Sequence, residues 1–191
     1  MNILLHVCCG PCAVYPLDFL RQQGHEVTGW FHNPNIHPYK EFRRRIEALE
    51  DFARQKRFRV EIDRTYGLRE FLRQVVFHED SRCGLCYDLR LLPTAQRAAE
   101  HGFAAFTTTL LYSKYQNHSL LHSKGIALAE QFGISFYYHD FRAGWQQGIE
   151  ESIALHLYRQ PYCGCIYSEQ ERYEKKMRKK TDLTASVPTS L

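Results

Sequence analysis

The chain alternates between short apolar runs and longer stretches in which apolar residues recur at helical spacing. In the short runs, apolar residues follow one another without polar alternation, as in strands that are covered on both faces of a parallel sheet. Alternation of such strands with helices predicts a doubly wound α/β fold with a mostly parallel sheet of about five strands. The expected strands span residues 2–8, 27–32, 58–62, 103–111 and 134–138.

The segments between these strands carry amphipathic helix patterns. The clearest begins after Pro38, where Phe42, Ile46 and Leu49 fall at helical spacing. Pro93 is expected to kink or locally break another of these helices. The last part of the chain is expected to be mainly helical and to form a helical C-terminal part. The remaining expected helices cover residues 11–23, 68–76, 87–102 and 119–132.

The length of the chain, 191 residues, suits one domain with a substantial core. We expect a single α/β domain over residues 1–178 and a flexible tail over residues 179–191. The first residues lack the basic flank and the apolar length of a signal peptide. No apolar run reaches the roughly 18 residues that are needed to span a bilayer. These features predict a cytoplasmic protein that does not enter a membrane.

Seven cysteines in a reducing compartment need a chemical explanation, because structural disulfides are rare there. The cysteines are clustered rather than scattered. Clustering favours metal binding or redox chemistry over a role as small core residues. The three groups are Cys8, Cys9 and Cys12; Cys83 and Cys86; and Cys163 and Cys165.

Two of these groups offer metal ligands. Cys8, Cys9 and Cys12 follow the first expected strand and lead into a helix, whose positive N-terminal end favours thiolates. Cys83 and Cys86 form a CxxC pattern, which is expected to make a turn with both sulfurs facing one metal. Zinc and iron–sulfur clusters both accept thiolates, so the residues alone leave these two cofactors open.

The third group, Cys163-Gly164-Cys165, has a spacing that permits a short-loop disulfide, since Gly164 tolerates the required backbone turn. A strained disulfide of this kind is easily reduced and suits a catalytic redox pair. As alternatives, these two cysteines could be metal ligands or could be thiols without a chemical role.

The expected site lies beyond the carboxyl ends of the strands, where ligands gather in this fold class. Asn33 and Asn35 follow the second expected strand, and Tyr112 and Ser113 follow the fourth. Both segments should therefore meet the first cysteine group. The chain has neither a GxxxxGK[ST] loop nor a GxGxxG motif after its first strand, so ATP use is not expected.

Basic residues gather at positions 43–45, 56–59 and 175–180, on a chain of net charge +4. Together with the many aromatic residues, these runs favour a surface that binds nucleic acid through its phosphates and bases.

Four motifs in a fixed order carry a resemblance to a known family. Over residues 3 to about 170, the chain resembles the QueH-type epoxyqueuosine reductases. This resemblance implies the nucleotide-binding α/β fold of the ATP-pyrophosphatases, the HUP-like fold. Lys114 departs from the family pattern, in which proline is expected. The motifs are His6-Val7-Cys8-Cys9-Gly10-Pro11-Cys12, Trp30-Phe31-His32-Asn33-Pro34-Asn35-Ile36-His37-Pro38, Arg82-Cys83-Gly84-Leu85-Cys86-Tyr87 with Arg90-Leu91, and Phe106-Thr107-Thr108-Thr109-Leu110-Leu111.

The resemblance also implies an activity and a cofactor. Members of the family carry a [4Fe-4S] cluster and reduce epoxyqueuosine at the wobble position of tRNA to queuosine, the last step of that modification. The implied partners are tRNA carrying epoxyqueuosine and an external electron donor. By motif, the cluster ligands would be Cys8, Cys9, Cys83 and Cys86.

The remaining cysteines receive roles from the same resemblance. Cys163 and Cys165 would be the redox-active catalytic pair. Cys12 would have a supporting role or would help to bind a second metal, and an additional iron ion stays open. Two other functions also stay open. A zinc-bound, non-catalytic tRNA-binding module gives the third cysteine group no role, and a tRNA sulfur-transfer enzyme would need activation by ATP.

Overall fold

The computed structural model describes the backbone of residues 1–185. It describes the side chains of residues 1–175 and of Met177. Its centre is a five-stranded sheet in the order β3-β2-β1-β4-β5, and every pair of neighbouring strands is parallel. The predicted fold class, with about five parallel strands, is confirmed. The strands are β1 (Asn2–His6), β2 (Glu26–Phe31), β3 (Val60–Ile62), β4 (Ala105–Thr108) and β5 (Ser135–Phe136).

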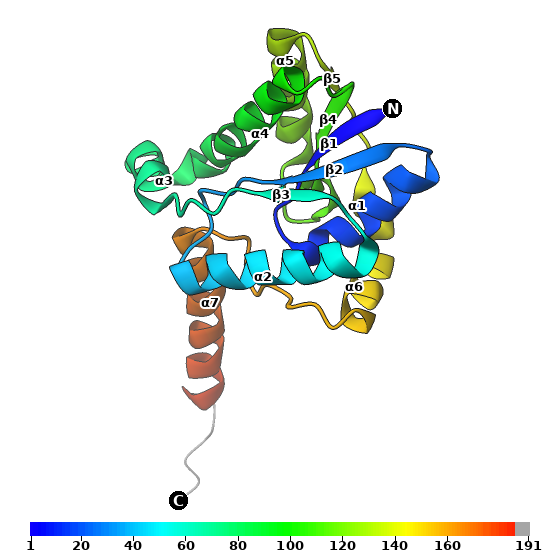
Figure 1. Cartoon of the computed structure of the whole chain (residues 1–191). Helices are drawn as coiled ribbons and strands as arrows, with labels where there is room; N and C mark the ends of the chain where they lie inside the picture. The colour runs from blue at the N-terminus through cyan, green and yellow to red at the C-terminus, as the bar shows by residue number, and fades with distance from the viewer. Residues whose placement is uncertain (186–191) are drawn as a thin grey trace, which may run out of the picture.

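Helices cover both faces of the sheet (Figure 1). Helices α4 and α5 lie on one side, and α1, α2 and α6 lie on the other. Helix α7 leads away from the body of the molecule. The helices are α1 (Gly10–Gln22), α2 (Tyr39–Lys56), α3 (Leu68–Val75), α4 (Arg82–Glu100), α5 (His118–Phe132), α6 (Trp145–Ala154) and α7 (Ile166–Ala185).

The central strand β1 explains why the first apolar run lacks polar alternation. Ile3, Leu4 and Leu5 are almost completely buried, because β1 pairs with β2 and β4 at its edges and has helices on both faces. Burial of one such side chain stabilises the fold by about 1.5–3 kcal/mol. An uninterrupted apolar run is therefore required at this position of the sheet.

The observed elements differ from the predicted ones in instructive ways. Strand β4 ends at Thr108, because the Thr108 hydroxyl accepts a hydrogen bond from the Leu110 backbone N–H (3.1 Å) and begins a 3₁₀ turn over Thr109–Tyr112. Helix α4 runs through Pro93 without a break. Helix α7 continues to Ala185, so it overlaps the expected tail at 179–191, and positions 186–191 lie outside the described residues.

The predicted turn at Cys83 and Cys86 is wrong. Both residues lie in the first two turns of α4, which begins at Arg82. Within the described residues, no helix is long and apolar enough to cross a membrane.

A cysteine-rich candidate active site

Three strand ends meet at the carboxyl edge of the sheet, as the sequence predicted. The backbone N–H of Cys8, after β1, donates a 3.0 Å hydrogen bond to the hydroxyl of Thr109, after β4. The side-chain amide of Asn33, after β2, donates to the carbonyl oxygen of Val7 at 2.9 Å. These contacts hold the first cysteine group at a fixed place on the edge of the sheet.

The sulfurs of Cys8, Cys9 and Cys12 lie within 4.8 Å of one another, and all three residues are buried. Helix α1 begins immediately after Cys9 and packs closely on α2. A Cβ at Gly10 would lie only 2.7 Å from the carbonyl oxygen of Ala48, so glycine is required there. Three thiols this close, at the positive end of a helix, form a donor set for a soft metal.

The three thiols do not share a negative charge equally. Hydrogen bonds from the Cys12 and Cys9 thiols lower the pKa of Cys8 well below its usual value. Burial raises the pKa of Cys9. Hydrogen bonding with the Cys8 and Cys9 sulfurs raises that of Cys12. The geometry therefore concentrates the first thiolate on Cys8.

The other four cysteines gather in a second place. Cys86 and Cys165 are buried in one small apolar cluster with Phe71 and Val75. Burial raises the pKa of Cys86 to about 12, with the negative charge of Cys163 and Cys165 adding to the effect. The fold thus brings the CxxC pair of α4 near the Cys163-Gly164-Cys165 segment, which the sequence had not predicted.

Arg90 lies between the two cysteine groups. Its side chain is 1% exposed, and its Nη1 lies 3.4 Å from the Asn33 Oδ1. Burial disfavours its charge, but attraction to Cys86, Cys163 and Cys8 outweighs burial and raises the pKa of Arg90. Its Nε and Nη2 atoms have no hydrogen-bond partner in the described part of the chain. Two donor nitrogens of a buried cation are thus available to a bound group.

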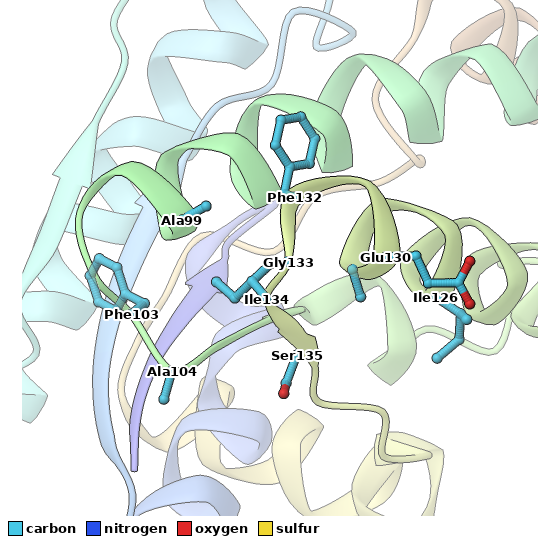
Figure 2. Close-up of a pocket in the computed structure, with 10 residues that line it drawn as sticks. Ala99, Phe103, Ala104, Ile126, Glu130, Phe132, Gly133, Ile134 and Ser135 are labelled. Carbon is cyan, nitrogen blue, oxygen red and sulfur yellow. The ribbon is translucent and has the colours of Figure 1, made fainter.

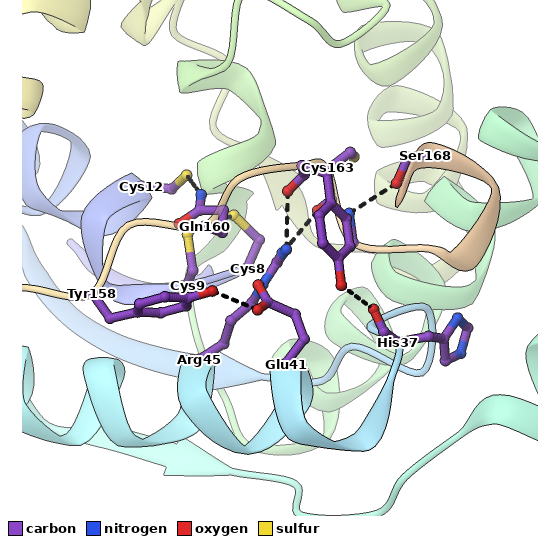
Figure 3. Close-up of polar contacts among 12 residues, drawn as sticks. Cys8, Cys9, Cys12, His37, Glu41, Arg45, Tyr158, Gln160, Cys163 and Ser168 are labelled. Atoms are coloured by element: carbon purple, nitrogen blue, oxygen red, sulfur yellow. Dashed lines mark hydrogen bonds and ion pairs between the residues drawn. The ribbon is translucent and has the colours of Figure 1, made fainter. Parts of the chain in front are cut away.

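A second buried arginine, Arg45, binds the segment that carries Cys163 (Figure 3). The Arg45 guanidinium donates to the carbonyl oxygen of Cys163 at 2.8 Å and to that of Tyr162 at 2.9 Å. Its Nε donates to Glu41 at 2.8 Å, and Glu41 in turn accepts a 2.6 Å hydrogen bond from Tyr158. Arg45 was predicted as part of a surface run that binds phosphate. That prediction is wrong for this residue, which is 1% exposed.

The same segment is bound at three further points. The hydroxyl of Tyr162 donates to the carbonyl oxygen of His37 (2.5 Å), and the His37 backbone N–H donates to that of Gly164 (2.8 Å). Gln160 donates to the Cys12 sulfur at 3.2 Å. A Cβ at Gly164 would lie 3.0 Å from the side-chain nitrogen of Asn35. These contacts fix the segment that carries Cys163 beside the first cysteine group (Figure 3).

A cavity of about 510 Å³ opens over these residues. Cys8, Cys12, Arg90 and Cys163 are among the residues that line it. A second cavity, of about 730 Å³, lies near the amino ends of β4 and β5 (Figure 2). Its lining contains no cysteine, and Glu130 is the one ionisable group among the residues that form it. The cysteine-lined cavity is therefore the candidate active site.

The chain is similar to known proteins along most of its length. A family profile described as "Epoxyqueuosine reductase QueH" matches residues 3–171. An epoxyqueuosine reductase QueH from Dehalococcoides mccartyi is 38% identical over 174 residues, which cover 91% of this chain and 96% of that protein. The one from Thermotoga maritima is 34% identical over 183 residues, which cover 91% of this chain and 93% of that protein.

A solved structure shares the fold. It is the crystal structure of a predicted subunit of tRNA methyltransferase from Methanocaldococcus jannaschii, with a TM-score of 0.56 and 11% sequence identity. The match covers 93% of this chain and 88% of the other. At this level of identity, the likeness concerns the fold alone.

Proposed function

Because this chain belongs to the epoxyqueuosine reductase QueH family, we propose that it reduces epoxyqueuosine at the wobble position of tRNA to queuosine. The family makes it an oxidoreductase. The observation that carries the proposal is the buried group of Cys8, Cys9 and Cys12, of which Cys8 and Cys12 line a cavity that also exposes Cys163. The substrate tRNA also favours a cytoplasmic location.

The cofactor that we propose is a [4Fe-4S] cluster. Thiolates are the usual ligands of such clusters, and Cys8, Cys9, Cys83 and Cys86 would supply them. One-electron transfer from an external donor is the chemistry that such a cluster supplies when bound. Cys12 is the one cysteine of the first group that is not a proposed cluster ligand. It would support the cluster or hold an additional iron ion.

Two features of the chain fit an iron–sulfur cluster, which carries a negative charge with its thiolate ligands. The buried guanidinium groups of Arg45 and Arg90 both feel the charge of the Cys8 sulfur, and they offset the cost of burying thiolates. In the described residues, two buried donor nitrogens of Arg90 and both side-chain polar atoms of Asn35 have no hydrogen-bond partner. Hydrogen bonds from such groups to sulfur tune the reduction potential of a cluster.

The catalytic pair that we propose is Cys163 and Cys165. Oxidation of their two thiols to a disulfide releases two electrons and two protons. These balance the reduction, in which both epoxide C–O bonds break, a C=C bond forms and the oxygen leaves as water. Both residues are free thiols, with Cys163 exposed at the cavity and Cys165 buried behind it. Cys163 is thus the thiol that can approach the substrate first.

Protonation of the leaving oxygen is needed, because an alkoxide is a poor leaving group. The Cys163 thiol is one proton donor at the cavity. Its sulfur accepts a 3.3 Å hydrogen bond from the Gln116 side chain, which holds the sulfur at the cavity wall.

Purification without oxygen, followed by an assay on tRNA that carries epoxyqueuosine, tests the function. A brown protein with a broad absorption band near roughly 400 nm, iron and acid-labile sulfide is expected. Nucleosides from the treated tRNA should contain queuosine in place of epoxyqueuosine. A colourless zinc protein that binds tRNA without reducing it would favour the non-catalytic tRNA-binding module instead.

A further inference from the structure

A ladder of aromatic rings runs from α1 to the rim of the cysteine-lined cavity. Tyr15 stacks near Tyr112 with ring centres 6.5 Å apart, and Tyr112 stacks on Trp145 at 5.1 Å. The ladder ends at Tyr115, whose ring meets the Trp145 ring edge-to-face at 5.9 Å. Tyr115 is 84% exposed and lines the cavity. Its exposed ring contributes little to the core, so the fold does not account for an aromatic residue there.

The backbone around Tyr115 is held in place. Its N–H donates to the Ser113 hydroxyl at 3.2 Å. The next residue, Gln116, accepts a 2.9 Å hydrogen bond from Tyr87 and donates to the sulfur of Cys163 at 3.3 Å. The backbone of Tyr115 is therefore fixed next to the proposed redox pair, and its ring contacts Trp145 edge-to-face. This is what a preorganised binding surface requires.

Positive charge lies on the same cavity. Arg159, Arg172 and Lys175 line it, are exposed, and form no ion pair with another residue in the described part of the chain. Glu171 is the single acidic residue among those that form the cavity, and Arg82 forms an ion pair with it. The rim therefore attracts anions. A rim of arginine and lysine beside an exposed aromatic ring matches the phosphates and bases of a single-stranded nucleic acid.

We propose that the cavity seats one nucleotide of a single-stranded RNA loop, with its base stacked on Tyr115 and its flanking phosphates at Arg159, Arg172 and Lys175. This inference rests on the proposed function and names the groups by which the same site recognises its RNA. A single strand is required, because bases inside a duplex offer no free face for stacking. The cavity of about 510 Å³ lies within the range of roughly 300–1,000 Å³ that small-ligand sites have.

Binding of a labelled anticodon stem–loop RNA that carries epoxyqueuosine tests the proposal. The Tyr115→Ala variant should raise its Kd about tenfold, which is within the effect of losing one base–aromatic stack. Tyr115→Phe keeps the ring and should bind almost as wild type. Tyr39→Ala removes a tyrosine that is also exposed, at 53%, but lies on α2 outside the cavity, and it serves as the matched control. Iron and sulfide content should be unchanged in all three variants.

The phosphate contacts have a separate readout. The double variant Arg159→Ala/Arg172→Ala should make log Kd depend less steeply on log salt concentration, by about one to two units of slope. Wild-type affinity and KM in Tyr115→Ala would overturn the stacking site, while reduction of epoxyqueuosine by the wild type would leave the proposed function standing. Conversely, if the wild type binds the RNA through Tyr115 but never reduces it, the proposed function fails and the RNA site stands.

Discussion

The guanidinium of Arg45 donates a 2.8 Å hydrogen bond to the carbonyl oxygen of Cys163, a residue 118 positions away in the chain. A second hydrogen bond, to Tyr162, makes the contact a two-point grip on the backbone of the proposed redox element. Arg45 belongs to α2, which packs under the sheet, so it connects the redox element to the rigid body of the fold. The position of Cys163 therefore depends on a residue that touches neither its sulfur nor the substrate.

Replacement of Arg45 by methionine should destabilise the protein and release this element. Glu41 would be left buried with its charge unpaired, and breaking a buried pair in this way costs about 3–5 kcal/mol. Urea denaturation would measure the loss. The double variant Arg45→Met/Glu41→Gln should regain part of the stability, but Cys163 should still be alkylated faster than in the wild type. Alkylation at the wild-type rate in the double variant would contradict the positioning role.

The inward position of Arg45 is predictable from the sequence. Position 45 lies three residues after Phe42 and four before Leu49, so the apolar stripe of the helix already placed it on the inward face. By composition, the run of three consecutive arginines predicts a basic surface, but the helical period places only Arg43 and Arg44 on the outer face. Arg43, by contrast, is partly exposed and pairs with Glu47 on the outer face.

The strands could be predicted from the sequence because each strand is a local pattern of apolar residues. The convergence of the segments after β1, β2 and β4 followed from the topology of parallel sheets, and it is confirmed by the contacts of Cys8 and Asn33. The neighbourhood of Cys86 and Cys165 could not be predicted in this way. It depends on the packing of the segment before α7 against α4, which no local pattern encodes. The sequence identifies Arg90 only as a residue of a motif. Its burial between the two cysteine groups is also a tertiary property and could not be predicted from it.

Metal content should separate the proposed cluster ligands from the other cysteines. Replacement of Cys83 or Cys86 by alanine should lower iron and acid-labile sulfide, because each removes one of the four proposed thiolates. The sulfurs of Cys8, Cys9 and Cys12 already lie together, so Cys12 is the residue that could take over as a ligand. Full iron and sulfide in Cys83→Ala, with loss in Cys12→Ala, would transfer the ligand role to Cys12.

The proposed redox pair has a different signature. Cys163→Ser should keep its iron and sulfide and still bind tRNA, but it should lose multiple-turnover reduction of epoxyqueuosine, because a single thiol cannot form the disulfide. Alkylation followed by mass spectrometry should show Cys163 linked to Cys165 in the wild type after one turnover. Turnover at the wild-type rate in Cys163→Ser would end the redox-pair hypothesis. Loss of metal together with activity would instead make these cysteines ligands.

We expect the free energy of unfolding to decrease as the pH is lowered, because His37 is buried. Its side chain is fully buried, and its Nε2 donates to the carbonyl oxygen of Pro34 at 3.1 Å. The other ring nitrogen, Nδ1, has no partner in the described residues, so a proton added there would be buried without an acceptor. Burial accordingly lowers the pKa of His37 to about 4, although the hydrogen bond to Pro34 partly opposes the shift.

Because the pKa of His37 is lowered in the folded protein, acid destabilises the fold. The unfolded chain, in which a histidine has a pKa of about 6.5, binds the proton at higher pH than the folded chain does. The stabilisation by neutral His37 is therefore complete above about pH 6.5. It is lost as the pH falls towards 4, at a rate of about 1.4 kcal/mol per pH unit. Urea denaturation of wild type and His37→Gln, at matched metal content between pH 7 and 4, should give a shallower dependence in the variant. Equal slopes in the two proteins would show that another group controls the acid sensitivity.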